Sequence, residues 1–202
     1  MEQLGQIKTR ILEGENGAKN LEVKMAGKTF ELPFKLIGGR MVGFLDISGQ
    51  VSLIEAAADE LAEKLVKSGV EFDTILNPVA KSNALAHAIA LRLSKARGKE
   101  IAKTVVARKS SGSAKVEATY RSVTTPRDQT ISLTDDDAEY LRGKRILLLD
   151  DVYGGGGTTK ALWELAQKAG SAVAAHAVIG VEAGVPLPEG LFYLFELPVL
   201  EA

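Results

Sequence analysis

The sequence predicts an α/β protein whose mostly parallel sheet is flanked by helices, with a small N-terminal lobe in front of it. Over residues 51–202, segments with the apolar spacing of strands alternate with segments that have the spacing of helices. This alternation is typical of a parallel sheet with helices on both faces. Residues 146–149 are consecutive apolar residues, as expected of a central strand buried on both faces. Residues 1–50 are instead broken by glycines, which indicates a separate lobe.

Local sequence patterns predict the individual strands and helices. Residues 20–25 and 29–32 have the composition of short strands. Residues 51–67 place their apolar side chains on one helical stripe, which ends at Ser68 and Gly69. For the rest of the core we predict strands at 72–76, 101–107, 116–123, 130–133, 146–149 and 172–181, helices at 83–94 and 160–169, and a final strand and tail within 191–200.

The composition is that of a globular chain with a substantial core. A length of 202 residues with 46% hydrophobic residues suits one domain with an appendage. The absence of cysteine excludes disulfides and thiolate metal sites, and it favours a cytoplasmic location. A net charge of −1 gives no sign of nucleic-acid binding. No apolar run is long enough to predict a membrane span or a targeting segment.

The most informative motif lies directly after the strand at 146–149. Its polar part consists of Asp150, Asp151, Gly154, Gly155, Gly156, Gly157, Thr158 and Thr159. Glycines let backbone amides close on an anion, and the start of the helix that follows attracts phosphate. Carboxylates beside such a loop suit a ligand with vicinal hydroxyls, because ionised carboxylates accept hydrogen bonds from a diol. The motif therefore predicts a site for a ribose 5-phosphate.

Two better-known glycine motifs do not match this run. A Walker A loop requires a glycine directly before its lysine, whereas Lys160 follows Thr159. A Rossmann pattern begun at Gly154 meets Thr159 at its third glycine position. A helix cap with a flexible turn is the simpler alternative, but caps rarely need four glycines after two acids.

The run from Ile146 to Thr158 resembles the signature of the type I phosphoribosyltransferases. In that family a hydrophobic strand, two acids and a short loop of threonine and glycine hold the 5-phosphate of phosphoribosyl pyrophosphate. Gly154 and Gly155 stand where the family usually has Thr, Ser or Ala, so much of the hydroxyl contact falls to Thr158. The resemblance covers about residues 40–185 and implies that the N-terminal lobe is a hood over the active site.

The turn after the strand at 72–76 is a second candidate anion site. It places Lys81, Ser82 and Asn83 at the start of a helix. In the resembling family this is the pyrophosphate loop, whose amides are exposed by a non-proline cis peptide. The resemblance therefore implies pyrophosphate contacts for Ala80, Lys81 and Ser82. A plain helix cap with a solvated lysine is the alternative.

A pair of positive charges follows the strand at 101–107. Arg108 and Lys109 are expected at the same edge of the sheet as the glycine loop. A guanidinium group holds phosphate oxygens bidentately and a lysine adds a point charge, which suits a leaving group that gains charge. In the resembling family, an arginine-lysine pair at this place is a feature of the adenine and xanthine branch. The resemblance implies pyrophosphate contacts for this pair, with a solvated strand end as the alternative.

The resemblance also implies a base pocket between the core and the hood. The residues expected there are Phe44, Leu45, Asp46, Val152 and Glu182. Phe44 or Leu45 would cover the ring, and the Asp46 carboxylate would favour an exocyclic amine because it accepts but does not donate. The chain lacks the lysine that xanthine-type relatives carry after the last core strand, so adenine is favoured. Alternatively, Asp46 is a surface turn residue and Phe44 is a core residue.

Residues 110–125 are expected to form a mobile hairpin that closes over the substrate. Lys115, Tyr120 and Arg121 are its candidate contacts. A lid of this kind would exclude water and so prevent hydrolysis of the activated sugar. His87 and His176 fall within a predicted helix and a predicted strand, and both are expected to be packed structural residues.

These residues together predict a phosphoribosyltransferase. It would move the 5-phosphoribosyl group to a purine base, with adenine favoured, giving a nucleoside monophosphate and pyrophosphate in purine salvage. Asp150 and Asp151 would be catalytic, and Mg²⁺ would bind through substrate oxygens with one of these aspartates. The expected partners are phosphoribosyl pyrophosphate, a nucleobase and a second copy in a homodimer, without nucleic acid or membrane.

Three alternatives stay open at this point. The acceptor could be xanthine, guanine, hypoxanthine or orotate. The chain could be a non-catalytic regulator that senses phosphoribosyl pyrophosphate, although residues 1–50 lack the helices and basic residues of a DNA-reading domain. It could also bind a nucleoside phosphate without sugar chemistry, which would leave the positive strand ends unexplained.

Overall fold

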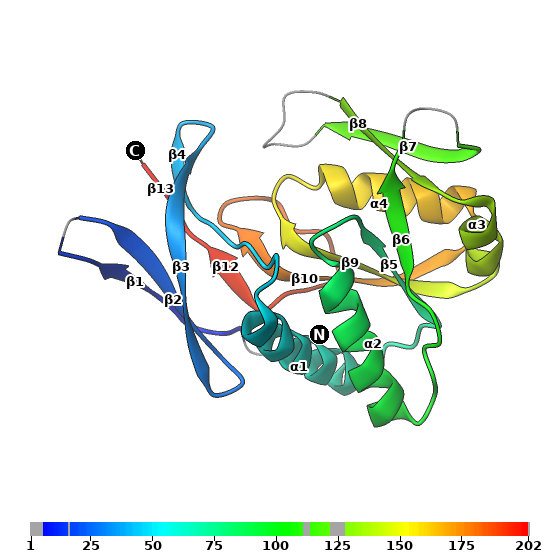
Figure 1. Cartoon of the computed structure of the whole chain (residues 1–202), viewed down its shortest axis with the longest axis horizontal. Coiled ribbons are helices and arrows are strands. Elements are labelled where there is room, and N and C mark those ends of the chain that lie inside the picture. Colours follow the sequence, from blue (N-terminus) through cyan, green and yellow to red (C-terminus); the bar gives the residue numbers. More distant parts are fainter. Residues whose placement is uncertain (1–5, 16, 111–113, 122–127, 202) are drawn as a thin grey trace.

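The chain folds into a large, mostly parallel sheet flanked by helices, with a smaller antiparallel sheet beside it (Figure 1). The computed structural model describes residues 6–15, 17–110, 114–121 and 128–201. We call the larger sheet with its helices the core, and the smaller sheet the hood. The predicted fold class is confirmed by this arrangement.

The core sheet has the strand order β11-β10-β9-β5-β6-β8-β7, and β12 also pairs with β10. Its strands are β5 (Thr74–Pro78), β6 (Val105–Lys109), β7 (Val116–Arg121), β8 (Asp128–Leu133), β9 (Arg145–Tyr153), β10 (Ala172–Glu182), β11 (Leu191–Phe192) and β12 (Phe195–Leu197). The adjacent strands β11, β10, β9, β5 and β6 pair in parallel. β8 is antiparallel to both of its neighbours, β6 and β7. The carboxyl ends of β5, β9 and β10 therefore meet at one edge, where open α/β sheets bind ligands.

Helices cover both faces of the core sheet (Figure 1). The helices are α1 (Val51–Lys67), α2 (Asn83–Arg97), α3 (Asp135–Leu141) and α4 (Gly157–Lys168). Leu147 and Leu149 of β9 pack with α1 and α2, whereas Leu148 packs with α4 on the opposite face. This burial on both faces explains the uninterrupted apolar run of β9. Among the described residues, no helix is both long and apolar enough to cross a membrane.

The hood is an antiparallel sheet with the order β1-β2-β3-β4-β13. Its strands are β1 (Thr9–Glu13), β2 (Lys19–Met25), β3 (Lys28–Ile37), β4 (Arg40–Gly43) and β13 (Val199–Leu200). β3 pairs with β2 through residues 28–33 and with β4 through residues 34–37. Pro33 lies at this change of partner, as expected for a residue without an amide hydrogen. The last strand of the chain thus completes a sheet that begins near the N-terminus.

Several element boundaries differ from the predictions. The strand predicted at 101–107 begins only at Val105, because side chains bind the backbone before it. The Ser94 hydroxyl accepts a hydrogen bond from the Ile101 amide at 2.8 Å, and the Thr74 hydroxyl donates one to the Lys103 carbonyl. The strand predicted within 191–200 is instead split into three short strands shared between core and hood.

Three elements, β1, β4 and α3, were not predicted from the sequence. β1 forms by pairing with β2, and β4 forms by pairing with β3; no local sequence pattern predicts either strand. α3 follows Thr134, whose hydroxyl accepts from the Asp137 amide at 3.1 Å, and its first turn carries three aspartates. An N-cap threonine followed by acids is a recognised start signal, so this helix could have been found.

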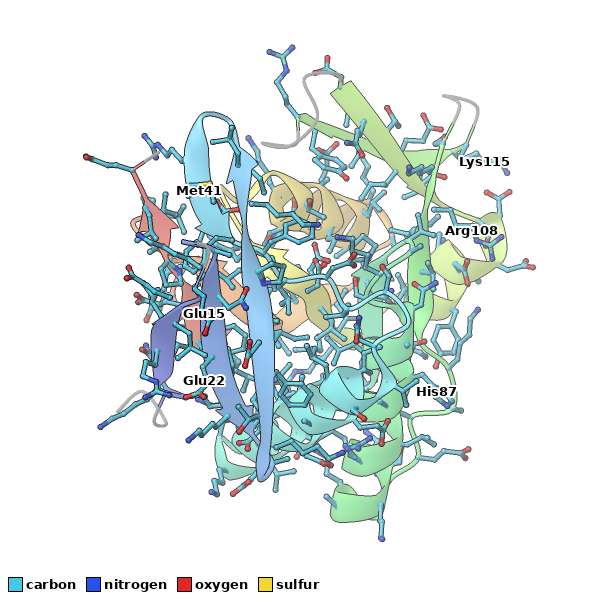
Figure 2. The ribbon with its side chains drawn as sticks, turned by 60° about the vertical axis from the view of Figure 1, so that its left-hand side comes forward. Glu15, Glu22, Met41, His87, Arg108 and Lys115 are labelled. Atoms are coloured by element: carbon cyan, nitrogen blue, oxygen red, sulfur yellow. The ribbon has the colours of Figure 1, made fainter. Side chains whose placement is uncertain are left out.

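Two other expectations concern the hairpin and the histidines. The strand predicted at 116–123 corresponds to β7 up to Arg121. Residues 111–113 and 122–125 of the predicted mobile hairpin lie outside the described part of the chain. His176 is buried in β10, as predicted. The prediction for His87 was wrong, because its side chain lies on the exposed face of α2 (Figure 2).

Candidate active site

A cavity lies between the hood and the carboxyl ends of β5, β9 and β10. Its lining includes Val42, Phe44, Leu45, Lys81, Arg121, Asp150, Asp151, Val152, Gly154, Gly157, Thr158 and Glu182. These residues come from β4 of the hood and the segment after it, the loop after β5, the hairpin, the ends of β9 and β10, and the glycine loop with the start of α4. The fold therefore brings segments that are far apart in the sequence into one place.

The glycine loop turns the chain from β9 into α4. Gly155 and Gly156 have φ angles of 81° and 75°, in the left-handed region that other residues rarely adopt. A Cβ added at Gly156 would also lie 2.7 Å from the Tyr153 hydroxyl. The first hydrogen bond of α4 runs from the Lys160 amide to the Gly156 carbonyl at 2.9 Å. The amides of residues 157–159 consequently have no partner within the helix, and their position suits an anion.

The hairpin of β7 and β8 lies across the start of α4 (Figure 1). A Cβ added at Gly157 would lie 2.7 Å from the Arg121 carbonyl and 3.5 Å from the Tyr120 ring, so only glycine allows this close approach. Arg121 also lines the cavity. Lys115 has a different place, because its ammonium group pairs with Asp135 at 2.7 Å on the exposed surface.

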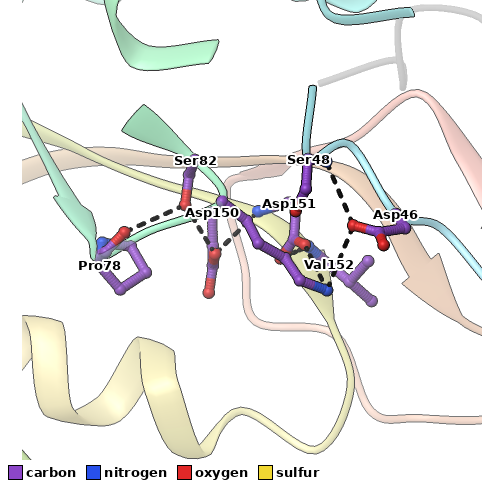
Figure 3. Close-up of polar contacts among 8 residues, drawn as sticks. Asp46, Ser48, Pro78, Ser82, Asp150, Asp151 and Val152 are labelled. Atoms are coloured by element: carbon purple, nitrogen blue, oxygen red, sulfur yellow. Dashed lines mark hydrogen bonds and ion pairs between the residues drawn. The ribbon is translucent and has the colours of Figure 1, made fainter. Parts of the chain in front are cut away.

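The two aspartates at the end of β9 have different surroundings (Figure 3). Asp150 is buried, and its carboxylate accepts hydrogen bonds from the Ser82 hydroxyl at 3.0 Å and the Asp151 amide at 2.8 Å. Burial, together with the adjacent charge of Asp151, raises the pKa of Asp150 well above its usual range. The Asp151 carboxylate accepts from the Val152 amide at 2.9 Å and lies 3.8 Å from the Lys81 ammonium group. Asp150 thus ties β9 to the loop after β5, while Asp151 faces the lysine.

Lys81 connects the end of β9 with the segment that follows β4 of the hood. Its ammonium group lies 3.8 Å from the Asp46 carboxylate and 3.8 Å from the Asp151 carboxylate. The peptide bond between Val79 and Ala80 is cis, as the resemblance implied for this loop. Because the Lys81 side chain is 45% exposed, both ion pairs are weak and can open for a ligand.

The residues expected around the base are divided between two cavities. Leu45, which is buried, lines the main cavity, and Phe44, which is half-buried, lines both the main cavity and a second one beside it. Asp46 lies beside a separate cavity and accepts a hydrogen bond from the Ser48 amide at 3.2 Å. The backbone and side chain of Ser48 lower the pKa of the Asp46 carboxyl. Glu182 lines the main cavity, and its burial raises the pKa of its carboxyl.

A family model described as the phosphoribosyl transferase domain matches residues 49–195. The chain belongs to the phosphoribosyltransferase family. The matched residues include Lys81, both aspartates of β9 and the whole glycine loop, so the recognised domain contains the core side of the cavity. Comparison with curated proteins finds no significant match.

Solved structures with the same fold include several phosphoribosyltransferases. The adenine phosphoribosyltransferase from Rhodothermus marinus DSM 4252 is 19% identical with a TM-score of 0.57, and 93% of each chain is covered. The enzyme from Giardia lamblia, complexed with 9-deazaadenine, is 17% identical with a TM-score of 0.57, covering 94% of this chain and 93% of that one. A purine phosphoribosyltransferase from Pyrococcus horikoshii Ot3 is 19% identical with a TM-score of 0.51, covering 72% and 84%. These likenesses establish the shared fold.

The Arg108 and Lys109 pair of this phosphoribosyltransferase lies apart from the cavity. Arg108 is exposed and its guanidinium group lies 4.0 Å from the Asp137 carboxylate of α3. Figure 2 shows Arg108 on the side of the molecule away from Met41 of the hood. The predicted contact of this pair with pyrophosphate therefore stays a prediction.

Sequence reasoning missed several residues of the site. Tyr153 supports the glycine loop through the contact of its hydroxyl with Gly156. Ile37, Val42 and Leu197 add apolar surface to the cavity. The aromatic residue between the acids and the glycines was a usable signal for Tyr153. No signal existed for Leu197, because it reaches the cavity only through the pairing of β12 with β10.

Proposed function

We propose that this phosphoribosyltransferase transfers the 5-phosphoribosyl group from phosphoribosyl pyrophosphate to a purine base, with adenine favoured. The products would be a nucleoside monophosphate and pyrophosphate. The observation that carries the proposal is the 3.8 Å approach of the Lys81 ammonium group to the Asp151 carboxylate. It joins the segment proposed for the pyrophosphate to the segment proposed for the ribose. The glycine loop and the free amides of α4 support a place for the 5-phosphate beside them.

In the proposed reaction, the bond between the anomeric carbon and a pyrophosphate oxygen breaks. A bond forms between that carbon and a ring nitrogen of the base, which loses its proton. Positive charge develops on the sugar ring, and a carboxylate favours this charge more in the transition state than in the ground state. Asp151 lines the cavity, and it would take this role and accept hydrogen bonds from the ribose hydroxyls. Lys81 would exchange its carboxylate partners for pyrophosphate oxygens as the leaving group gains charge.

Asp150 has a positioning role in this proposal. Its carboxylate holds the Ser82 hydroxyl at 3.0 Å, and Ser82 lies in the loop proposed for the pyrophosphate. Because Asp150 is 8% exposed, it has little surface left for a substrate. The ribose half and the pyrophosphate half of the site are thereby held at a fixed distance, which favours reaction between well-oriented groups.

The resemblance also implies Mg²⁺, and the donor set of the cavity fits this ion. Mg²⁺ binds through one or two carboxylates, waters and substrate phosphates. Asp151, with Asp150 beside it, supplies carboxylates at the cavity wall. Among the described residues no group of three or more carboxylates or histidines is arranged to hold a metal, so substrate oxygens would complete the coordination. The ion would neutralise charge on the pyrophosphate group.

A purine acceptor is supported by the relatives and by the cavity. The similar structures are described as adenine and purine phosphoribosyltransferases, and one contains 9-deazaadenine. The hood side of the cavity is apolar, as a flat heterocycle requires. We extend the proposal to purine salvage, to a cytoplasmic location and to a homodimer, as expected from the sequence.

The test is release of pyrophosphate from phosphoribosyl pyrophosphate and Mg²⁺ with each of adenine, guanine, hypoxanthine, xanthine and orotate. We expect release with a purine, and Asp151→Asn should lower kcat by about 100-fold because it removes charge beside the transition state. Asp136→Asn is the matched control, because that aspartate is exposed on α3. Absence of pyrophosphate release with all five bases would contradict the proposed enzyme.

A further inference from the structure

Glu182 holds an unusual place in the cavity. It is the last residue of β10, and its neighbour Val181 pairs in register with Tyr153 of β9. The Glu182 carboxyl lies directly against Gly154, the first glycine of the loop. A Cβ added at Gly154 would lie 2.5 Å from the carboxyl carbon and 2.5 and 2.7 Å from its oxygens. The carboxyl thus occupies the space that a side chain at position 154 would fill.

The Glu182 carboxyl has no polar partner in the part of the chain that the structure describes. It is half-buried, and burial raises the pKa of this group because no nearby cation compensates for lost solvent. The lysine of the cavity, Lys81, is already between Asp46 and Asp151. A partly desolvated acceptor without a donor is costly, so a ligand that supplies a donor gains affinity here.

The surroundings of Glu182 fit a flat ring with one polar edge. Val42 of the hood, Val152 of β9 and Leu197 of β12 line the same cavity with apolar side chains. The other carboxylates of the cavity are engaged: Asp150 accepts from Ser82, and Asp151 faces the lysine. Glu182 is therefore the carboxyl that remains for the acceptor.

We propose that Glu182 determines acceptor specificity, by accepting a hydrogen bond from the exocyclic amino group of the base, and that Gly154 is glycine to make room for this carboxyl. The acceptor class is then an amino-substituted purine rather than an oxo-substituted one, because a carbonyl oxygen would face a carboxylate oxygen. This inference rests on the proposed function and names its substrate class. In this proposal Glu182, and not Asp46, accepts the hydrogen bond from the amino group, because Asp46 lies beside the other cavity.

The inference is tested by equilibrium binding, with isothermal titration calorimetry of adenine and hypoxanthine. We expect the wild-type protein to bind adenine at least about 10-fold more tightly, because a site built around a hydrogen bond rejects a base that cannot make it. Glu182→Gln keeps the size of the side chain but can donate as well as accept, so the preference should fall below about 3-fold. Glu189→Gln, an exposed change in the loop after β10, is the matched control and should keep the wild-type ratio.

A second variant tests the role of Gly154 without changing any charge. Gly154→Ala places a methyl group where the carboxyl lies and should displace it, so its adenine preference should fall as in Glu182→Gln. Circular dichroism establishes that both variants are folded.

An unchanged ratio in both variants, or a wild-type preference for hypoxanthine, overturns the specificity assignment while leaving the enzyme in place if pyrophosphate is still released. If the wild-type protein binds neither base and releases no pyrophosphate with any base, the proposed function itself fails.

Discussion

No side chain can be added at Gly156 without disturbing the loop proposed for the 5-phosphate. Gly156 has a φ of 75°, and an added Cβ would lie 2.7 Å from the Tyr153 hydroxyl. We expect Gly156→Ala to lower the free energy of unfolding by about 1–3 kcal/mol, measured by urea denaturation, since a left-handed non-glycine residue costs about this much. Adding Tyr153→Phe removes the clashing hydroxyl and should recover part of the loss. If the double variant recovers nothing, the contact with the hydroxyl does not limit this position.

His176 makes the stability of the protein depend on pH. It is 6% exposed, its Nε2 lies 3.4 Å from the Thr159 hydroxyl, and burial lowers its pKa from 6.5 to about 4. The unfolded chain therefore binds more protons than the folded chain between these values. The contribution of this histidine to the free energy of unfolding is complete above pH 6.5 and is lost as the pH falls to about 4. The loss amounts to about 3 kcal/mol, at about 1.4 kcal/mol per unit of pKa.

Denaturant unfolding at pH 7.5 and at pH 5 measures this dependence. His176→Gln should show a smaller loss of stability between the two pH values than the wild-type protein does. His87→Gln is the matched control, because His87 is exposed and should leave the wild-type dependence unchanged. Equal pH dependence in all three proteins would count against a buried, neutral His176.

Thr134 caps the N-terminus of α3 and contributes to the stability of this helix. The Thr134 hydroxyl accepts from the Asp137 amide at 3.1 Å and donates to its carboxylate at 2.8 Å. Burial alone would raise the pKa of Asp137, but hydrogen bonds from Lys103 and Thr134 outweigh it and lower the pKa. Thr134→Ala should therefore cost about 1 kcal/mol of stability by denaturant unfolding, whereas Thr134→Ser should cost less because it keeps the hydroxyl. A serine variant as unstable as the alanine variant would point to packing instead.

Helices were easier to predict than strand boundaries, and α1 shows the reason. Its apolar stripe predicts the helix over 51–67, and the structure places it at Val51–Lys67. A stripe of this kind is repeated over several turns, so it survives local exceptions. β6 begins later than predicted, because its start depends on which backbone groups find strand partners and which are taken by Thr74 and Ser94.

The hood and the core are joined by a shared apolar cluster and by the C-terminal strand. Leu21, Val23 and Met25 of β2 share one apolar cluster with α1 and α2. β13 pairs with β4, and the Pro198 carbonyl accepts from the Gly43 amide at 3.0 Å. The hood therefore relies on residues from the opposite end of the chain.

Removing residues 198–202 tests this dependence. We expect the amides of β4 to exchange faster with deuterium, measured by mass spectrometry, because they lose their strand partner. The amides of β9 should keep their protection, since β9 lies between β5 and β10 in the core sheet. Equal acceleration in both strands would mean that the hood and the core open as one unit.

The fold class, the strand and helix that carry the motif, and the run of acids, glycines and threonines from Asp150 to Thr159 could all be recognised in the sequence. These features are local, because periodicity and turn chemistry act between residues a few positions apart. Which charged residues face the cavity depends on the tertiary structure. Lys81 lines the cavity and Arg108 pairs with Asp137 instead, although Lys81 follows β5 and Arg108 lies near the end of β6 in the same sheet. Which way such a side chain points depends on the neighbours packed around it, and those neighbours come from distant parts of the chain.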